Sequence, residues 1–179
     1  MAYDRLAESR RMIAEGVPQV PLRLTRRRRF IPLAFDVDGD VAATLFLRRG
    51  VSGNPWLEAW TLERRDGDWV VLGGGSGDGY DELFEPRSSI NGLFVSYGSG
   101  WSARNAGRLL PSRRGVSHVE MRLGSQVAAL RVSDRIIETP AHGLAIVVWS
   151  TRRPPAMAAL SSAGEPLGEV PHRRYPFQR

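Results

Sequence analysis

The 179-residue sequence lacks cysteine and lysine altogether. Without cysteine the chain has no disulfide, no thiol nucleophile and no cysteine-ligated zinc or iron–sulfur site. Without lysine it has no phosphate-binding P-loop, which needs a lysine after its glycine-rich segment, and no Schiff-base chemistry. These absences exclude several large classes of enzyme.

Long apolar runs are also absent. No stretch approaches the roughly 18 apolar residues that a membrane-spanning helix needs. Residues 1–15 are charged throughout and lack the apolar stretch of a secretory signal. We therefore expect a soluble, cytoplasmic protein with no membrane insertion. The length predicts one domain, or two small lobes that share a core.

All 25 basic residues are arginines, and charge is unevenly distributed along the chain. Residues 1–30 carry a net charge of +5, residues 31–85 of −7, and residues 86–179 of +8. An acidic middle between basic ends has two interpretations. It either holds the two halves together by electrostatic attraction, or leaves a basic face for an anionic partner.

The first half of the chain predicts one helix and then an antiparallel meander. Apolar residues at helical spacing from Ala2 to Ile13 indicate a helix that ends at Gly16. Alternating residues at 20–25, with Pro21 among them, are typical of an edge strand. Asp-Gly pairs and a Ser-Gly-Asn-Pro loop then separate further alternating segments. These segments predict strands at about 33–37, 41–47, 56–64 and 69–72.

A glycine-rich and then acidic segment follows at residues 73–91. The glycine run from Gly73 to Gly79 predicts a flexible connector, with one helical turn at about 81–84. Beyond it, short apolar segments recur every 8–12 residues or so, which is typical of a sandwich or small barrel. They predict strands at about 93–97, 118–123, 127–132, 135–139, 144–149, 156–160 and 167–170.

The predicted fold class is therefore mainly β, with one N-terminal helix. Residues 1–75 form the helix and the antiparallel meander, residues 76–91 the connector, and residues 92–179 a sandwich-like or small-barrel lobe. The continuous apolar runs at 127–130 and 146–149 indicate strands that are buried on both faces.

Most sequence motifs for enzyme chemistry are incomplete. Residues 98–103 fit the dinucleotide-binding pattern G-x-G-x-x-A, but the residues after them leave almost no room for the helix that must receive the pyrophosphate. His118, His142 and His172 do not have metal-ligand spacing. The carboxylates between Asp36 and Asp40 cluster at a predicted turn, where turn formation and solvation explain them. We expect no cofactor and no metal site.

Arg26, Arg27, Arg28 and Arg29 form the one feature with a sharp physical interpretation. Together with Arg23 they make a concentrated surface of guanidinium groups that can bind phosphates or carboxylates in a bidentate way. The alternative is a solvated loop whose arginines pair with the acidic middle of the chain. In an extended chain two of the four would point to each face.

The tryptophans leave a similar choice open. They lie mostly on predicted strands, where core packing is the default and an exposed aromatic groove for a peptide or sugar is the alternative. The five are Trp56, Trp60, Trp69, Trp101 and Trp149.

The leading functional hypothesis is a non-catalytic binding module for a protein or an anionic partner, with the arginine run as its contact surface. A nucleic-acid-binding protein that uses the same arginines is the first alternative. A hydrolase without a linear motif is the second, and it predicts a deep pocket that holds a histidine or carboxylate with a shifted pKa.

Overall fold

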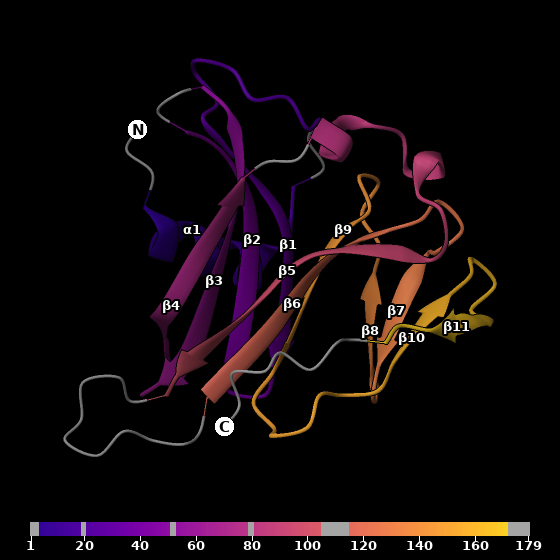
Figure 1. The fold of residues 1–179 in the computed structure, drawn as a ribbon. Coiled ribbons are helices and arrows are strands. Elements are labelled where there is room, and N and C mark those ends of the chain that lie inside the picture. Colours follow the sequence, from indigo (N-terminus) through magenta and orange to yellow (C-terminus); the bar gives the residue numbers. More distant parts are fainter. Residues whose placement is uncertain (1–3, 19–20, 51–52, 79–80, 105–114, 172–179) are drawn as a thin grey trace.

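A computed structural model describes residues 4–18, 21–50, 53–78, 81–104 and 115–171. Within these residues it contains one α-helix, two short 3₁₀ helices and eleven strands in three antiparallel sheets, which confirms the mainly β class (Figure 1). The described helix is too short and too polar to cross a membrane.

The first sheet has the order β1-β2-β3-β4, the second β5-β6-β9 and the third β11-β10-β7-β8. The strands are β1 (Phe30–Asp38), β2 (Val41–Arg49), β3 (Pro55–Arg65), β4 (Asp68–Asp78), β5 (Phe94–Ala103), β6 (Gly115–Leu123), β7 (Ala129–Val132), β8 (Arg135–Glu138), β9 (Leu144–Trp149), β10 (Met157–Leu160) and β11 (Pro166–Glu169). The helices are α1 (Arg5–Glu15), η1 (Asp81–Phe84) and η2 (Arg87–Ser89).

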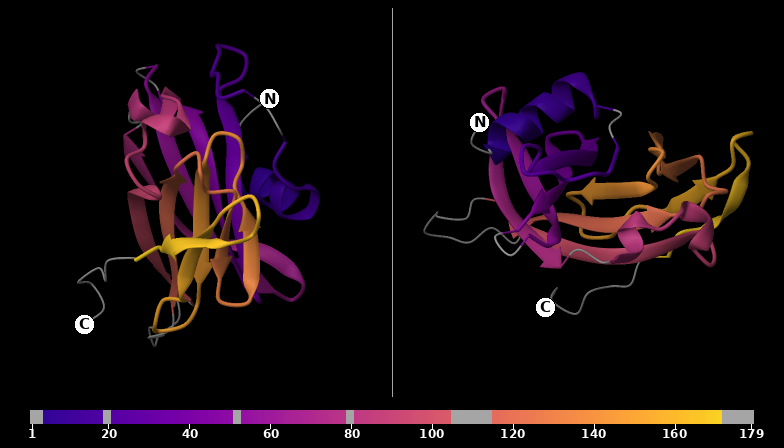
Figure 2. Two further views of the ribbon diagram at one scale, coloured as in Figure 1. Left: turned by 90° about the vertical axis from the view of Figure 1, so that its right-hand side faces the viewer. Right: turned by 90° about the horizontal axis from the view of Figure 1, so that it is seen from above.

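Helix α1 ends where its sequence predicts and begins at Arg5, while Ala2 of the predicted helix lies outside the described residues. The Asp4 carboxylate accepts hydrogen bonds from two backbone N–H groups of the first turn, and Gly16 ends the helix with a φ of 86°. The helix lies on the outer face of the first sheet, with the other two sheets on the opposite side (Figure 2). There Met12 is buried, and the Ser9 and Thr44 hydroxyls lie 2.8 Å apart.

The meander β1–β4 forms as its turn residues predict, with two corrections. The predicted edge strand at 20–25 is wrong for residues 21–25, which form no strand, and residue 20 lies outside the described residues. Pro21 removes a backbone donor there. The predicted flexible connector is also wrong for Gly73–Gly77, which pairs with β3 as part of β4.

Two hydrophobic cores lie on the two faces of the second sheet. Even-numbered residues of β9, such as Ile146, pack against the inner face of the first sheet, and odd-numbered ones, such as Val147, pack against the third sheet. The expectation that this apolar run is buried on both faces is confirmed. The first core therefore contains residues from both predicted lobes.

Arg135 of β8 joins the edges of β1 and β9. Its guanidinium donates to the backbone carbonyls of Val37 and Val148, at 2.9 and 2.7 Å, and pairs with the carboxylates of Asp36 and Asp38. Asp36 is only 5% exposed and also accepts a 2.8 Å hydrogen bond from the Val148 N–H. The prediction that turn formation and solvation explain the carboxylates at 36–40 is thus wrong for Asp36, which the edge of β9 covers.

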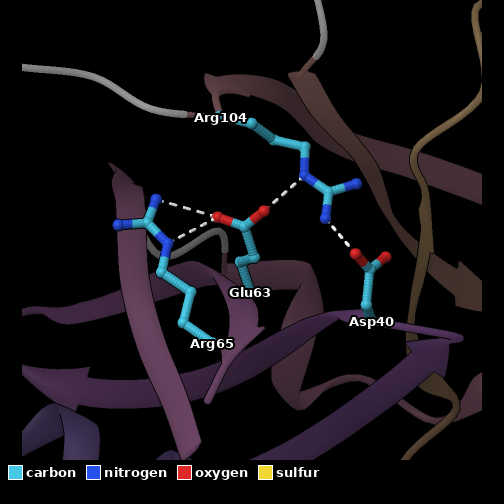
Figure 3. Close-up of polar contacts among 4 residues, drawn as sticks. All are labelled: Asp40, Glu63, Arg65 and Arg104. Atoms are coloured by element: carbon cyan, nitrogen blue, oxygen red, sulfur yellow. Dashed lines mark hydrogen bonds and ion pairs between the residues drawn. The ribbon is translucent and has the colours of Figure 1, made fainter. Parts of the chain in front are cut away.

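Arg104, directly after β5, makes a second connection to the first sheet (Figure 3). Its guanidinium bridges Asp40 in the β1–β2 turn and Glu63 of β3. Arg65 also pairs with Glu63, at 2.8 Å. Burial raises the pKa of Glu63, but hydrogen bonds from Arg104 and Arg65 outweigh it and lower the pKa below its usual value.

We predict that Arg135→Ala lowers the free energy of unfolding at pH 7 by about 2–4 kcal/mol, because it leaves the buried Asp36 carboxylate without its cation and two carbonyls without a donor. Urea denaturation measures this change. Arg131→Ala is the matched control, since Arg131 is exposed on the neighbouring strand β7. Equal effects of the two substitutions would contradict the role assigned to Arg135.

The buried Asp36 carboxyl should also make the free energy of unfolding depend on pH. Burial raises its pKa to about 6, against the lowering effects of the Val148 hydrogen bond and Arg135. A raised pKa in the folded state stabilises the fold at pH values below the unfolded pKa, and this stabilisation is lost as pH rises through 6. Between pH 4 and 6.5 we expect the free energy of unfolding of the wild type to fall by on the order of 3 kcal/mol relative to that of Asp36→Asn.

His142 changes the free energy of unfolding with pH in the opposite direction to Asp36. Burial, together with the nearby Arg122, lowers its pKa to about 4, so its stabilising effect is lost as pH falls from about 6.5 to 4. The two contributions oppose each other in the wild type, and the difference between wild type and Asp36→Asn isolates that of Asp36. Urea midpoints measured across this pH range would refute the assignment if the two proteins changed in parallel.

Candidate functional site

A cavity of about 810 Å³ opens on the outer face of the first sheet, beside the first turn of α1. We call it the tryptophan groove. The helix forms one wall, and β2, β3 and β4 form the floor and the other wall. Its lining residues are Asp4, Arg5, Leu6, Arg48, Trp56, Glu58, Trp60, Val71, Gly74 and Gly75.

Strand alternation explains why three of these side chains gather here. Trp56, Glu58 and Trp60 are every second residue of β3, so they project from one face, which is the face that α1 packs on. Arg48 of β2 is the cross-strand partner of Trp56. Gly74 of β4 is the cross-strand partner of Trp60.

Trp60 is held in place on several sides. Its ring lies over Gly74, where an added Cβ would come within 2.2 Å of a ring carbon. The Arg5 guanidinium lies 4.4 Å from the ring centroid, within range of a cation–π interaction. The indole N–H donates a 2.7 Å hydrogen bond to the Glu58 carboxylate. Trp60 is therefore a fixed wall of the groove.

The charges of the groove are largely balanced within it. Glu58 is only 5% exposed and pairs with Arg48 at 3.1 Å, in addition to accepting from Trp60. Asp4 caps the helix. Both carboxylates are thus engaged with protein groups, and the Arg48 side chain remains 43% exposed at the groove.

Trp56 is the open aromatic side chain of the groove, with 36% of its surface exposed. Gly50 leaves space for its ring, because a Cβ there would lie 2.5 Å from the indole nitrogen. The default expectation that the tryptophans pack in the core is correct for Trp69 and Trp149, which are buried. It is wrong for Trp56 and for Trp101, which is 53% exposed on β5.

The arginines singled out in the sequence lie on an exposed segment at the same end of the first sheet. Arg23, Arg26, Arg27, Arg28 and Arg29 are all exposed, and we call them the basic loop. None of them takes part in an ion pair with another described residue. Instead of an extended run, the loop contains a turn in which Thr25 and Arg28 exchange hydrogen bonds of 2.9 Å.

Strand register places the basic loop next to the groove. Arg29 accepts a 2.8 Å backbone hydrogen bond from Arg49. The following residue, Phe30, pairs with Arg48, which in turn pairs with Trp56. Neighbouring strands are about 4.8 Å apart, so Phe30 and Trp56 are separated by about 10 Å across the sheet. Trp56 and the start of β1, which directly follows the basic loop, therefore lie at the same end of the first sheet.

The other candidate sites do not assemble. The G-x-G-x-x-A segment at 98–103 is part of strand β5 and is paired with β6, and no helix begins within it. His118 is buried on β6 with its Nε2 3.3 Å from Glu120, and His172 lies outside the described residues. Among the residues that the structure describes, no three acidic or histidine side chains converge as a metal ion requires.

A smaller cavity of about 220 Å³ bears on the hydrolase hypothesis. It contains His142, but burial lowers the pKa of its ring to about 4, which makes it a weak base, and its Nδ1 already accepts a hydrogen bond from the Leu144 N–H. The remaining described lining residues, among them Pro18, Pro21 and Leu22, are apolar and offer no nucleophile. Asp36, whose pKa is also strongly shifted, lies between the edges of β1 and β9.

We predict that Gly74→Ala displaces the Trp60 ring, because the added methyl group overlaps it, and that Gly75→Ala does not. An added Cβ at Gly75 meets no atom within 4 Å, which makes it a matched control one residue away. The measurement is the tryptophan fluorescence and near-UV circular dichroism of the folded variants. An unchanged signal in Gly74→Ala would contradict the packing described for Trp60.

Comparison with known proteins gives no independent guide to the site. No family model, no curated protein and no solved structure matches the chain.

Proposed function

We propose that this protein is a non-catalytic binding protein for an anionic ligand, which lies in the tryptophan groove and extends onto the basic loop. The observation that carries the proposal is the register row Phe30–Arg48–Trp56, which sets an open aromatic ring and an exposed arginine beside five further exposed arginines. The sequence singles out the loop, and it leaves an exposed aromatic groove as the alternative to core packing of the tryptophans.

The electrostatics of the surface favour an anion. The Glu58 charge is offset by its pairing with Arg48. Asp4 is engaged in capping α1, while Arg5 covers Trp60. The basic loop then adds five positive charges at one end, with no described acidic partner. Guanidinium groups bind carboxylates, sulfates and phosphates through paired N–H donors, which suits them to such a ligand.

The chemistry of the groove supports binding rather than catalysis. A general acid or base needs a titratable group that can exchange a proton with the ligand. Both carboxylates of the groove already accept hydrogen bonds from protein donors, and its described lining contains no histidine. What the groove offers to a ligand is an aromatic face and apolar contact, and the basic loop next to it offers positive charge.

We predict that 8-anilinonaphthalene-1-sulfonate, an aromatic anion, binds the wild type and that Trp56→Ala weakens its binding about tenfold through loss of the ring contact. Trp101→Ala is the matched control, because Trp101 is an exposed strand tryptophan that does not line the groove. Fluorescence titration of the dye gives the dissociation constants.

Two results of this titration would contradict the proposal. In one, the wild type does not bind the dye. In the other, Trp56→Ala and Trp101→Ala bind it equally well, which would place the dye elsewhere on the surface.

A further inference from the structure

We infer that the anionic ligand is a single-stranded nucleic acid, with a base stacked on Trp56 and its phosphates along the basic loop. This inference rests on the proposed function and names the chemistry of its ligand. It is carried by the juxtaposition of the exposed Trp56 indole with a run of exposed arginines that ends at Arg29, one residue before Phe30, which lies about 10 Å from Trp56 across two strand spacings.

The spread of the positive charge favours a polyanion over a small anion. The basic loop distributes its arginines over residues 23–29, within and on both sides of the turn that Thr25 and Arg28 close. A single phosphate or sulfate can engage two or three donors of such a set. A chain of regularly spaced phosphates can engage several arginines along the loop, and each neutralised phosphate releases a counterion.

The aromatic component favours nucleic acid over an acidic peptide. A peptide rich in aspartate or glutamate would use the arginines but gains little from an open indole ring. Every nucleobase has a flat face that stacks on tryptophan, and proteins that bind single strands combine such stacking with a positively charged groove. Trp56 has the exposure that stacking needs, and Arg48 flanks it with an exposed guanidinium.

The position of Trp56 favours single strands over duplexes. In a duplex the bases are stacked on each other and only their edges reach the grooves. Trp56 is the cross-strand neighbour of Arg48 on the floor of the cavity, so a base must leave its stack to lie against the ring. A single strand can present an unstacked base without that cost.

The test is fluorescence anisotropy with a labelled dT12 oligonucleotide, its duplex with dA12, and an acidic control peptide of twelve glutamates, each titrated with the full chain between 50 and 200 mM salt. We expect binding of dT12 that is tighter than that of the duplex or the peptide and that weakens steeply with salt. The oligonucleotide should also displace bound 8-anilinonaphthalene-1-sulfonate.

Two pairs of variants locate the contacts. Trp56→Ala should weaken dT12 binding about 5- to 150-fold, while Trp101→Ala should leave it unchanged. Trp56→Leu, which keeps the apolar volume but removes the aromatic face, should weaken it as well. The triple variant R26A/R27A/R28A should reduce the slope of log K against log salt concentration by up to about 2, at about 0.7 for each lost phosphate contact.

R131A/R152A/R153A removes the same charge from exposed positions outside the loop and should keep the wild-type slope. A slope that falls equally in both triple variants would overturn the assignment to the basic loop.

The outcomes separate this inference from the function on which it rests. If the dye binds at Trp56 but dT12 does not bind at 50 mM salt, the inference is wrong and the anion-binding function stands. Equal affinity for the duplex or the glutamate peptide, or unchanged dT12 binding in both Trp56 variants, also overturns the inference. If neither dye nor oligonucleotide binds, both proposals are wrong.

Discussion

Guanidinium groups that donate to backbone carbonyls across element boundaries are the interaction on which this fold depends. Arg135 donates to one backbone carbonyl of β1 and to one of β9. Arg87 donates to the carbonyls of Leu123, Gly124 and Val127, at and after the end of β6. Arg10 fastens α1 to the Trp69 carbonyl. A buried carbonyl without a donor is costly, and arginine, with five N–H groups in a rigid fork, can satisfy two or three at once. The contacts of Arg135 join all three sheets, because β8 belongs to the third sheet, β1 to the first and β9 to the second.

The arginines therefore divide into two groups with different physical roles. The uneven charge along the sequence either attracts the two halves of the chain to each other or leaves a basic face for an anionic partner. The structure contains features of both. Arg104 and Arg135, from the basic C-terminal part, pair with Asp36, Asp40 and Glu63 of the acidic middle, which is the electrostatic attraction between the halves. The basic loop makes no such pair with a described residue. Because those acidic side chains are already engaged by other arginines, the loop keeps its charge on the surface.

Local patterns are enough to predict most of the strands, but they cannot decide between core packing of the tryptophans and an exposed aromatic groove. Alternation and turn residues indicated the hairpins of the first sheet, and the apolar run at 146–149 indicated burial on both faces. The groove depends on register, which sets Trp60 opposite Gly74 and Trp56 opposite Arg48. The prediction for the glycine run was wrong for the same reason, because the missing side chains at Gly73–Gly77 suggest flexibility until a tryptophan on the neighbouring strand is known to need the space. No local pattern predicts that Arg5 and Glu58 belong to the groove, because both are placed there by their contacts with Trp60.

Glycine in the middle of a strand weakens it, since it loses more backbone entropy on folding and contributes no side-chain contact. In β4 that cost is offset by what the absent side chain allows. The Trp60 ring can lie flat on the backbone at Gly74, and Arg5 can then cover its other face, so that the wall of the groove is set before any ligand arrives. A wall built on paired strands loses little entropy when a ligand binds, unlike a wall built from loops. For the proposed ligand, the tryptophan groove and the basic loop have different roles, because Trp56 accepts any flat base and the loop accepts any phosphate chain. Such a surface should therefore bind single strands with little preference for sequence.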